Sequence, residues 1–367
     1  MRKSPEPAGV QPILSLRDIV TEFATVSGRA RAVNGVSYDV MPGKILGVVG
    51  ESGSGKSVTV MSALGLLPRS ATVRGRAVFH GGRDLLAMKE RELQRVRGGE
   101  IGVIFQDPMT ALNPVMTIGE QIDETLKRHS TELGRRERSD RIVELLADVG
   151  IPAPRERKGQ YPHQFSGGMR QRAMIAMALA NSPSLLIADE PTTALDVTVQ
   201  AQILDLLMRL CDDHGTALVL ISHDLGVIAE MADQVVVMYG GRVVESSAID
   251  DVFHGARHPY TRGLLRSMPG RNADGSTPAG ASGRRTLLPA IPGAPPSPRE
   301  LPPGCAFQPR CDLAAGREQC LVQPPLAVVG QEHLTACHFH AELDGSGLGD
   351  AAAGVPTGTC THEEAAG

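Results

Sequence analysis

The feature that most constrains this chain is the octapeptide Gly-Glu-Ser-Gly-Ser-Gly-Lys-Ser at residues 50–57. It follows the apolar stretch 44–49, which has the character of a short buried strand, and it precedes residues 58–64, which can continue as a helix. Glycines allow backbone N–H groups to surround an anion, and the start of a helix adds a favourable field. Strand, G-x-x-x-x-G-K-S and helix together predict a phosphate-binding loop.

Individual residues of the loop have expected roles in binding a nucleoside triphosphate. Lys56 is expected to reach the β- and γ-phosphates, and the Ser57 hydroxyl is expected to ligate Mg²⁺. The alternative, a Gly/Ser-rich turn with an exposed lysine, does not account for the strand and helix on either side. The predicted nucleotide contacts are Gly50, Ser52, Gly53, Ser54, Gly55, Lys56, Ser57 and Val58.

The composition of the chain argues against some classes of binding partner. The net charge of −4, the absence of tryptophan and an aromatic content of 3% argue against a nucleic-acid surface. The N-terminus lacks the apolar segment of a signal peptide, and no stretch approaches the ~18 apolar residues of a membrane span. We therefore expect an intracellular chain that reaches a membrane only through partners.

The chain of 367 residues is long enough for one large domain and a smaller appendage. Its composition changes near residue 268, where Pro, Gly, Ser and Arg become crowded and apolar periodicity ends. The predicted organisation is a disordered N-terminus at 1–11, a main domain at 12–268 with a helical subdomain at about 115–180, a linker at 269–304, a small cysteine-bearing module at 305–340 and a disordered tail at 341–367.

Polar side chains end several of the predicted strands of the main domain. Asp189 and Glu190 close the apolar stretch 185–190, and Gln106 and His223 close two others. In an open α/β sheet these strand ends lie along one edge, where ligands bind. Asp189 is placed to hold Mg²⁺ and Glu190 to polarise an attacking water, with His223 as a γ-phosphate contact. The alternatives are a solvated pair of acids and a surface histidine.

These motifs together resemble the ATPase subunit of ATP-binding cassette (ABC) transporters over about residues 12–265. The phosphate loop, Gln106, the stretch Phe-Ser-Gly-Gly-Met-Arg-Gln-Arg at 165–172, the strand at 185–190, Thr-Ala-Leu-Asp at 193–196 and His223 occur in the family's order. The resemblance implies an α/β P-loop NTPase fold, an ABC ATPase domain with a RecA-like core sheet and a helical subdomain.

The resemblance also implies further site residues. Two such domains pair head to tail, so that Phe23 would stack on adenine and Asp196 would sit across the dimer seam. Gln106 would couple Mg²⁺ and water to the membrane subunits. Ser166, Gly167 and Gly168 would contact the γ-phosphate of the partner's ATP, and a Ser-Gly-Gly helix start is itself a favourable anion site.

Three positions depart from the family pattern. Phe165 and Met169 replace the usual leucine and glutamine of the signature stretch, and Thr193 replaces the serine of the next motif. The Ser-Gly-Gly core is intact and Glu190 is present, so the resemblance implies a site that hydrolyses ATP.

A second stretch, His-Pro-Tyr-Thr-Arg-Gly-Leu-Leu at 258–265, together with the cysteines that follow, resembles the oligopeptide/dipeptide/nickel branch of ABC importers. This predicts an ATPase for oligopeptide or dipeptide uptake, peripheral at the cytoplasmic face of the cell membrane. Its partners would be a second homologous ATPase subunit, in a homo- or heterodimer, two transmembrane permeases and an extracytoplasmic solute-binding protein, with no nucleic acid. The alternatives are import of nickel or another small solute, a soluble ABC ATPase in nucleic-acid transactions, and an ATPase regulated by its cysteine module.

The cysteines of the small module suit a metal site. They are separated by five, eight and sixteen residues, in a stretch with too few apolar residues for a good core: Cys305, Cys311, Cys320 and Cys337. Four thiolates suit tetrahedral zinc or an iron–sulfur cluster, and the resemblance favours [4Fe–4S] over zinc and over unliganded thiols. His338 and His340 are reserve ligands, Cys211 is expected to be a packed core residue, and Cys360 lies in the tail.

Overall fold

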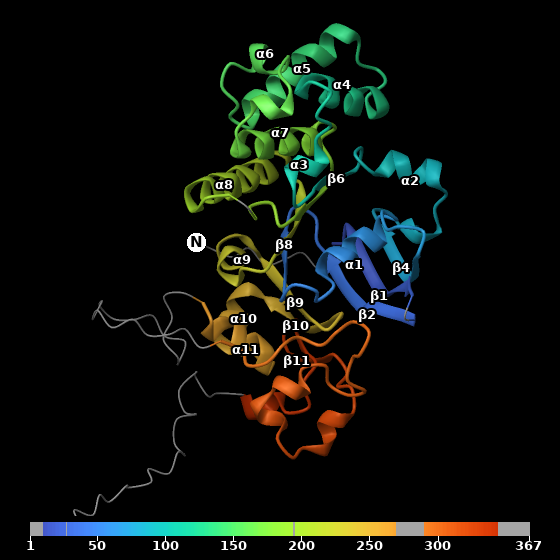
Figure 1. Ribbon diagram of the computed structural model, residues 1–367, viewed down its shortest axis with the longest axis vertical. Helices are drawn as coiled ribbons and strands as arrows, with labels where there is room; N and C mark the ends of the chain where they lie inside the picture. The colour runs from blue at the N-terminus through green and yellow to red at the C-terminus, as the bar shows by residue number, and fades with distance from the viewer. Residues whose placement is uncertain (1–9, 27, 194, 269–289, 344–367) are drawn as a thin grey trace, which may run out of the picture.

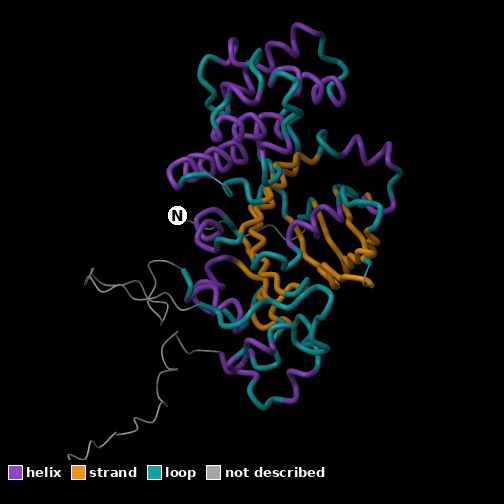
Figure 2. The backbone as a smooth tube through the Cα atoms, viewed as in Figure 1, coloured by secondary structure: helices purple, strands orange, loops and turns teal. Residues whose placement is uncertain are grey.

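The computed structural model describes residues 10–26, 28–193, 195–268 and 290–343. Their strands form two sheets near the middle of an elongated molecule, and helices α3 to α8 gather at one end of it (Figure 1, Figure 2). The last described residues form an irregular unit at the opposite end (Figure 1). Within the described residues, no helix combines the length and apolarity needed to cross a membrane.

The larger sheet has eight strands in the order β11-β12-β10-β9-β3-β8-β7-β6. Strands β6, β7, β8, β3 and β9 run parallel, and β9, β10, β12 and β11 pair antiparallel. The bounds are β3 Ile45–Val49, β6 Ile101–Ile104, β7 Leu185–Asp189, β8 Ala217–Ser222, β9 Gln234–Tyr239, β10 Arg242–Ala248, β11 Ala327–Gly330 and β12 His333–Thr335. Strands β9 and β10 form an antiparallel hairpin with Gly240 and Gly241 at its turn.

The central strands are apolar except at their ends, because both faces of this sheet are covered. In β8, Leu218 and Leu220 belong to a core that includes residues of the helices, whereas Val219 and Ile221 belong to a second core. The second core lies against the smaller, antiparallel sheet of order β2-β1-β4-β5. Its strands are β1 Leu14–Thr25, β2 Gly28–Val40, β4 Ala71–Phe79 and β5 Arg83–Asp84. The sequence by itself indicates neither β4 nor the separate sheet.

Helices connect the parallel strands and cover the sheet. The α-helices are α1 Lys56–Ala63, α2 Glu90–Val96, α3 Pro108–Ala111, α4 Ile118–His129, α5 Arg135–Asp148, α6 Pro154–Arg157, α7 Gly167–Leu179, α8 Val197–His214, α9 Leu225–Met231, α10 Ile249–Gly255 and α11 Pro259–Arg266. The 3₁₀ turns are η1 Leu85–Ala87, η2 Pro162–Gln164, η3 Gln308–Arg310, η4 Asp312–Ala314, η5 Glu318–Leu321 and η6 His340–Leu343.

Local chemistry explains where the helices of the end layer begin and end. Thr117 starts α4 with a capping box, in which its hydroxyl accepts from Glu120 N and the Glu120 carboxylate accepts from Thr117 N. Ser166 caps α7, as the sequence predicts. After α5, Gly150 adopts φ +72°, the left-handed conformation that commonly ends a helix and that glycine adopts without strain.

The C-terminal segment (residues 290–343) is attached to the larger sheet. Strand β12 pairs with β10, so that β11 and β12 extend the sheet beyond the hairpin. Within the stretch predicted as a linker, residues 269–289 lie outside the described residues. The described part contacts the core, since Arg31 N donates to Pro298 O at 3.1 Å. The predicted termini at 1–11 and 341–367 lie mostly outside the description, which begins at residue 10 and ends at 343.

Candidate functional site

The phosphate loop leads from β3 into α1, as the sequence predicts. Gly55 adopts φ +98°, and a Cβ at this position would lie 2.5 Å from Ala32 O, so that only glycine fits. Lys56 is buried and folds back across the loop, donating from Nζ to Gly50 O at 2.7 Å and to Glu51 O at 3.2 Å. The Lys56 ammonium group is thereby held inside the loop by two backbone carbonyl oxygens, in a position from which it can meet a phosphate.

Ser57 and Asp189 meet at the start of α1 and the end of β7. Ser57 Oγ donates to Asp189 Oδ1 at 2.7 Å, which places two oxygen ligands for a hard cation side by side. Burial raises the pKa of Asp189, and the Glu190 charge adds to this effect, whereas Ser57 and Lys56 oppose it. Burial lowers the pKa of Lys56, and the nearby carboxylates partly oppose this shift. A bound divalent cation and phosphates would stabilise the charged forms of both groups.

Side chains from the loops after β6, β7 and β8 contact the Glu190 carboxylate. Its Oε2 accepts from Gln106 Nε2 at 3.0 Å and from Thr193 Oγ1 at 2.9 Å. His223 Nδ1 lies 3.4 Å from the same oxygen. The backbone of Glu190 has φ +46°, a conformation that non-glycine residues rarely adopt and that recurs at functional sites. A carboxylate held in this way is suited to act on a water molecule.

A cavity of about 600 Å³ joins these groups, which is large enough for a nucleotide. Its lining residues come from the phosphate loop, from three strand ends and from α11: Glu51, Ser52, Gly53, Gly55, Lys56, Ser57, Val58, Gln106, Glu190, His223 and Leu264. Most of the residues predicted for the phosphate end of the site are therefore brought together. Ser54 is buried beside them, and its Oγ has no hydrogen-bond partner among the described residues.

The residues implied for adenine and for a partner subunit do not line this cavity. Phe23 is half-buried in β1, opposite Ala30 and Ala71. Ser166 and Gly167 are exposed at the start of α7. Their roles, together with those of Gly168 and Asp196, remain predictions that depend on nucleotide and on a second subunit.

The sequence does not single out three residues of the cavity wall and its surroundings: Glu51, Tyr260 and Leu264. Glu51 lies inside the loop motif, at a position where any residue satisfies the pattern. Its backbone N donates to the Tyr260 hydroxyl at 2.8 Å, so the His-Pro-Tyr stretch supports the loop. No local signal marks Tyr260 as a neighbour of residue 51, because 209 positions separate them.

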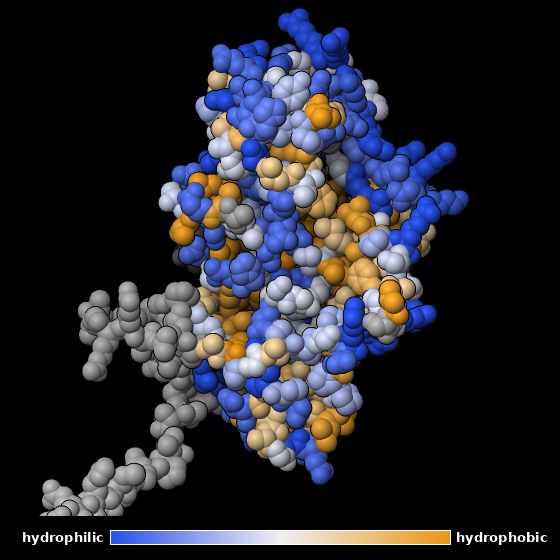
Figure 3. All heavy atoms as spheres, in the orientation of Figure 1, coloured by the Kyte–Doolittle hydropathy of each residue, from blue (hydrophilic) through white to orange (hydrophobic). Residues whose placement is uncertain are grey.

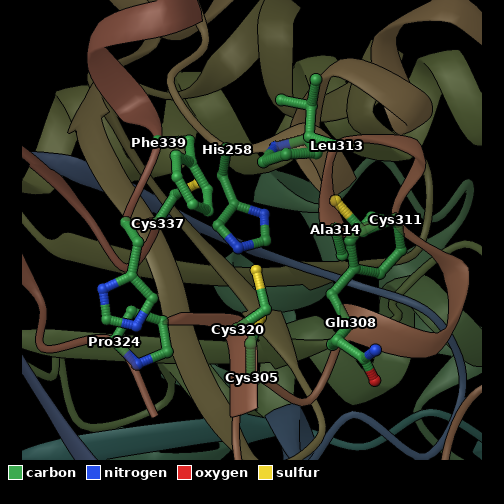
Figure 4. A pocket seen from close by; sticks show the side chains of 13 residues that line it. His258, Cys305, Gln308, Cys311, Leu313, Ala314, Cys320, Pro324, Cys337 and Phe339 are labelled. Carbon is green, nitrogen blue, oxygen red and sulfur yellow. The ribbon is translucent and has the colours of Figure 1, made fainter. Parts of the chain in front are cut away.

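A second, much smaller cavity of about 20 Å³ lies between the C-terminal segment and the start of α11 (Figure 4). All four cysteines of the predicted cluster line it, together with His258 and His338: Cys305, Cys311, Cys320 and Cys337. Burial raises the pKa of Cys311 and of Cys337 to about 11, which is unfavourable for thiolates without a bound cation. Among the described residues, no three His, Cys, Asp or Glu side chains are grouped closely enough to hold a metal ion.

The remaining histidines and cysteines considered as metal ligands make other contacts or lie elsewhere in the chain. His338 Nε2 contacts Val322 O at 3.0 Å, and His340 Nδ1 contacts Cys337 O at 2.9 Å. Cys211 is 3% exposed in the core of α8, as predicted. Cys360 lies outside the described residues.

The comparisons with known proteins agree with this geometry. Residues 33–193 match the family described as ABC transporter, and residues 244–320 match the C-terminal region of oligopeptide/dipeptide transporters. A putative peptide import ATP-binding protein of Brucella ovis is 51% identical over 334 residues, covering 89% of this chain and 97% of the relative. The oligopeptide transport ATP-binding protein OppD of Bacillus subtilis is 47% identical and covers 88% of both chains.

Solved structures show the same fold. The dimeric ATP-binding cassette MJ0796, in a post-hydrolysis state with ADP and phosphate, is 26% identical with a TM-score of 0.58, covering 64% of this chain and 98% of that one. CbiO1 of Clostridium perfringens is also 26% identical, with a TM-score of 0.56, covering 66% of this chain and 90% of that one. The phosphate loop, the carboxylates at the strand ends and these matches lead to one conclusion: the chain belongs to the ABC transporter ATPases, in the group with an oligopeptide/dipeptide transporter C-terminal region.

Proposed function

We propose that this chain hydrolyses ATP to drive the import of oligopeptides or dipeptides. The observation that carries the proposal is the arrangement around Glu190, where Gln106, Thr193 and His223 converge on one carboxylate oxygen beside the phosphate loop. The peptide cargo is supported by the match of residues 244–320 and by the names of the relatives.

The chain's own residues divide the work of hydrolysis. The amides of the phosphate loop and Lys56 bind the phosphates, and Ser57 and Asp189 are the oxygen ligands for Mg²⁺. Mg²⁺, when bound, supplies charge neutralisation for the transferring phosphoryl group. Glu190 accepts a proton from the attacking water, while Gln106 and His223 orient that carboxylate and the γ-phosphate.

A complete transporter requires partners. We propose a head-to-tail pair of ATPase subunits in which Ser166, Gly167 and Gly168 contact the partner's ATP, with Asp196 at the seam and Phe23 against adenine. Two permeases and a solute-binding protein complete the assembly, which holds this chain at the cytoplasmic face of the membrane. Large apolar side chains stand exposed in the stretch that follows Gln106 in the chain, with Met109 63% and Val115 78% exposed, and these suit contact with a permease. Hydrophilic residues otherwise dominate this helical end of the molecule in the face shown in Figure 3.

Affinity purification tests the proposed assembly. Tagged Glu190→Gln protein, recovered from native membranes with ATP present, is expected to bring down two permeases and a second ATPase subunit. Lys56→Ala serves as the matched control, because it is expected to keep the permeases but to hold the second subunit less firmly. The recovered binding protein can then be screened against peptides, nickel and other small solutes. Recovery of soluble or nucleic-acid partners alone would overturn the transport function and leave the ATPase chemistry.

We also propose that the four cysteines of the C-terminal segment hold a [4Fe–4S] cluster, with zinc as the alternative. Their convergence on one cavity supports this, although the thiols would have to move closer together to form a ligand set. Anaerobic purification followed by iron, sulfide and zinc analysis distinguishes the two metals. Cys320→Ser is expected to lose the metal, whereas Cys211→Ser, in the α8 core, is expected to keep it. Wild-type protein without either metal would refute the proposal.

A further inference from the structure

Arg310 connects the C-terminal segment to the phosphate loop. It lies in η3, next to Cys311, and its side chain is only 6% exposed. Nη1 donates to Glu51 Oε2 at 2.7 Å and Nη2 donates to Glu51 Oε1 at 3.1 Å. This two-pronged ion pair joins residues 259 positions apart. In Figure 1 the segment that carries Arg310 lies at the β9–β10 side of the larger sheet, far from α4 to α6.

The guanidinium group of Arg310 is fixed on all sides. Nε donates to Pro292 O at 2.7 Å, and Nη2 also donates to Ile291 O at 3.2 Å. Nη1 contacts the Tyr239 hydroxyl at 3.2 Å. The rings of Tyr239 and Phe307 lie 5.8 and 6.0 Å from its central carbon, within the range of cation–π contact. Because these other contacts fix Arg310, its guanidinium group holds the Glu51 carboxylate in one position.

Glu51 is the only acid of the loop motif, and it lines the cavity together with Lys56 and Ser57. Its backbone carbonyl accepts from Lys56 Nζ, so the position of residue 51 also affects the lysine that meets the phosphates. An unpaired carboxylate here would repel a triphosphate, and this repulsion is strong where water is partly excluded. Paired with Arg310, the same carboxylate is neutralised and is held in place.

We propose that Arg310 is a positioning residue for ATP, acting through Glu51. It neutralises the Glu51 carboxylate beside the phosphates, so that this charge does not repel them, and it does not touch the nucleotide itself. The C-terminal segment thereby becomes part of the ATP site's support, a role that its cysteines alone do not indicate.

Nucleotide binding to the full-length protein tests this role, with titrations of ATP, ADP and adenosine. Arg310→Met leaves Glu51 charged and unpaired, so the Kd for ATP is expected to rise about tenfold. ADP should weaken less and adenosine should be unchanged, because the repulsion grows with phosphate charge. Arg310→Lys, which restores the charge without the two-pronged geometry, is expected to recover part of the affinity.

The double variant Glu51→Gln/Arg310→Met separates positioning from simple bracing. Removing the carboxylate removes the repulsion, so the double variant should bind ATP within about threefold of wild type, more tightly than Arg310→Met alone. If Arg310 only braces the fold, the double variant will stay as weak as the single one, and adenosine will weaken alongside ATP. Either result overturns the proposal.

Arg83→Met provides a matched control. Arg83 also forms a two-pronged pair, with Glu100 at 2.8 and 2.6 Å, and it also lies over an aromatic ring, that of Phe79, but it does not line the cavity. Its loss should leave all three affinities unchanged. Thermal unfolding of each variant reports its integrity. If Arg310→Met does not fold, Arg310→Gln carries the test, because it also removes the charge and leaves Glu51 unpaired. An unchanged ATP affinity in that variant would refute the role.

Discussion

At the scale of single residues, the site depends on side chains held in unusual settings. Glu190 combines a backbone of φ +46° with three polar neighbours at one oxygen. Strain of this kind persists only when the surroundings fix it, and here β7, β8 and the Gln106 loop do so. The carboxylate is thus oriented before nucleotide binds.

Glu190→Gln should separate binding from hydrolysis. The amide has nearly the same shape but cannot accept the water's proton, so the hydrolysis rate of the assembled transporter is expected to fall about 10²- to 10³-fold. The Kd for ATP should stay within about twofold. Phosphate-release and nucleotide-binding assays measure the two effects. Glu100→Gln, an acid outside the cavity, is the control, and an unchanged rate in Glu190→Gln would exclude the general-base role.

His258 should make the fold sensitive to acid. Burial lowers the pKa of His258 to about 4 from 6.5, with Glu245 opposing the shift. The unfolded chain therefore binds a proton that the folded chain does not between pH 6.5 and 4, and stability falls as pH falls through this window. The loss between pH 7 and pH 5 is expected to be about 2 kcal/mol.

Urea unfolding at pH 7 and pH 5 measures this dependence. In His258→Asn the side chain can still accept from Tyr260 N, as Nδ1 of His258 does at 3.1 Å, but it no longer titrates. The variant should lose about 2 kcal/mol less than wild type on acidification. An identical pH dependence in the two proteins would show that other groups are responsible.

At the scale of elements, the N-termini of α4 and α7 have the same cap chemistry but different predicted functions. Ser166 caps α7 by accepting from Met169 N at 3.3 Å, and Thr117 caps α4 by accepting from Glu120 N at 3.3 Å. Both belong to the layer at the helical end, but only the start of α7 carries the Ser-Gly-Gly stretch. Stability alone cannot distinguish them.

Ser166→Ala and Thr117→Ala should therefore differ in activity and not in stability. Each is expected to lower the free energy of unfolding by about 1 kcal/mol through loss of the cap. Only Ser166→Ala should reduce hydrolysis by the assembled pair, by at least about tenfold, because it would remove the proposed donor to the partner's γ-phosphate. Equal hydrolysis by the two variants would remove Ser166 from the site.

At the scale of the whole molecule, charged side chains help to join the C-terminal segment to the ATPase core. One junction is the Arg310–Glu51 pair, and another is a buried carboxylate on β10. Glu245 accepts from His333 Nε2 at 2.8 Å, from His258 N at 3.2 Å and from the backbone N of Arg257. The β10–β12 pairing brings His333 to this position.

His333→Ala should loosen this junction. The Glu245 carboxylate would keep its backbone donors but lose a side-chain donor inside the protein, which is expected to cost about 2 kcal/mol of unfolding free energy. His333→Gln can still donate and should cost less than half as much. Urea unfolding measures both variants, and equal losses in the two would show that packing, not the hydrogen bond, holds the junction.

Local pattern explains which parts of the site the sequence could predict. The phosphate loop is contiguous, and Gln106, Asp189, Glu190 and His223 each end an apolar strand, so parallel pairing alone brings them to one edge. Strand β4 is not predictable from the sequence because its apolar and polar residues alternate weakly, several of them are exposed, and its sheet is separate. The spacing of the four cysteines predicts that they form a group, but it does not predict the distances between them.

By itself, then, the sequence determined the nucleotide site, the order of its motifs and the family, because each rests on residues close together in the chain or on strand ends that any such sheet aligns. Only the tertiary structure decided that β11 and β12 extend the larger sheet, and that Arg310 reaches Glu51 across 259 positions. Contacts of that span leave no period or spacing in the sequence, because they depend on how distant elements pack.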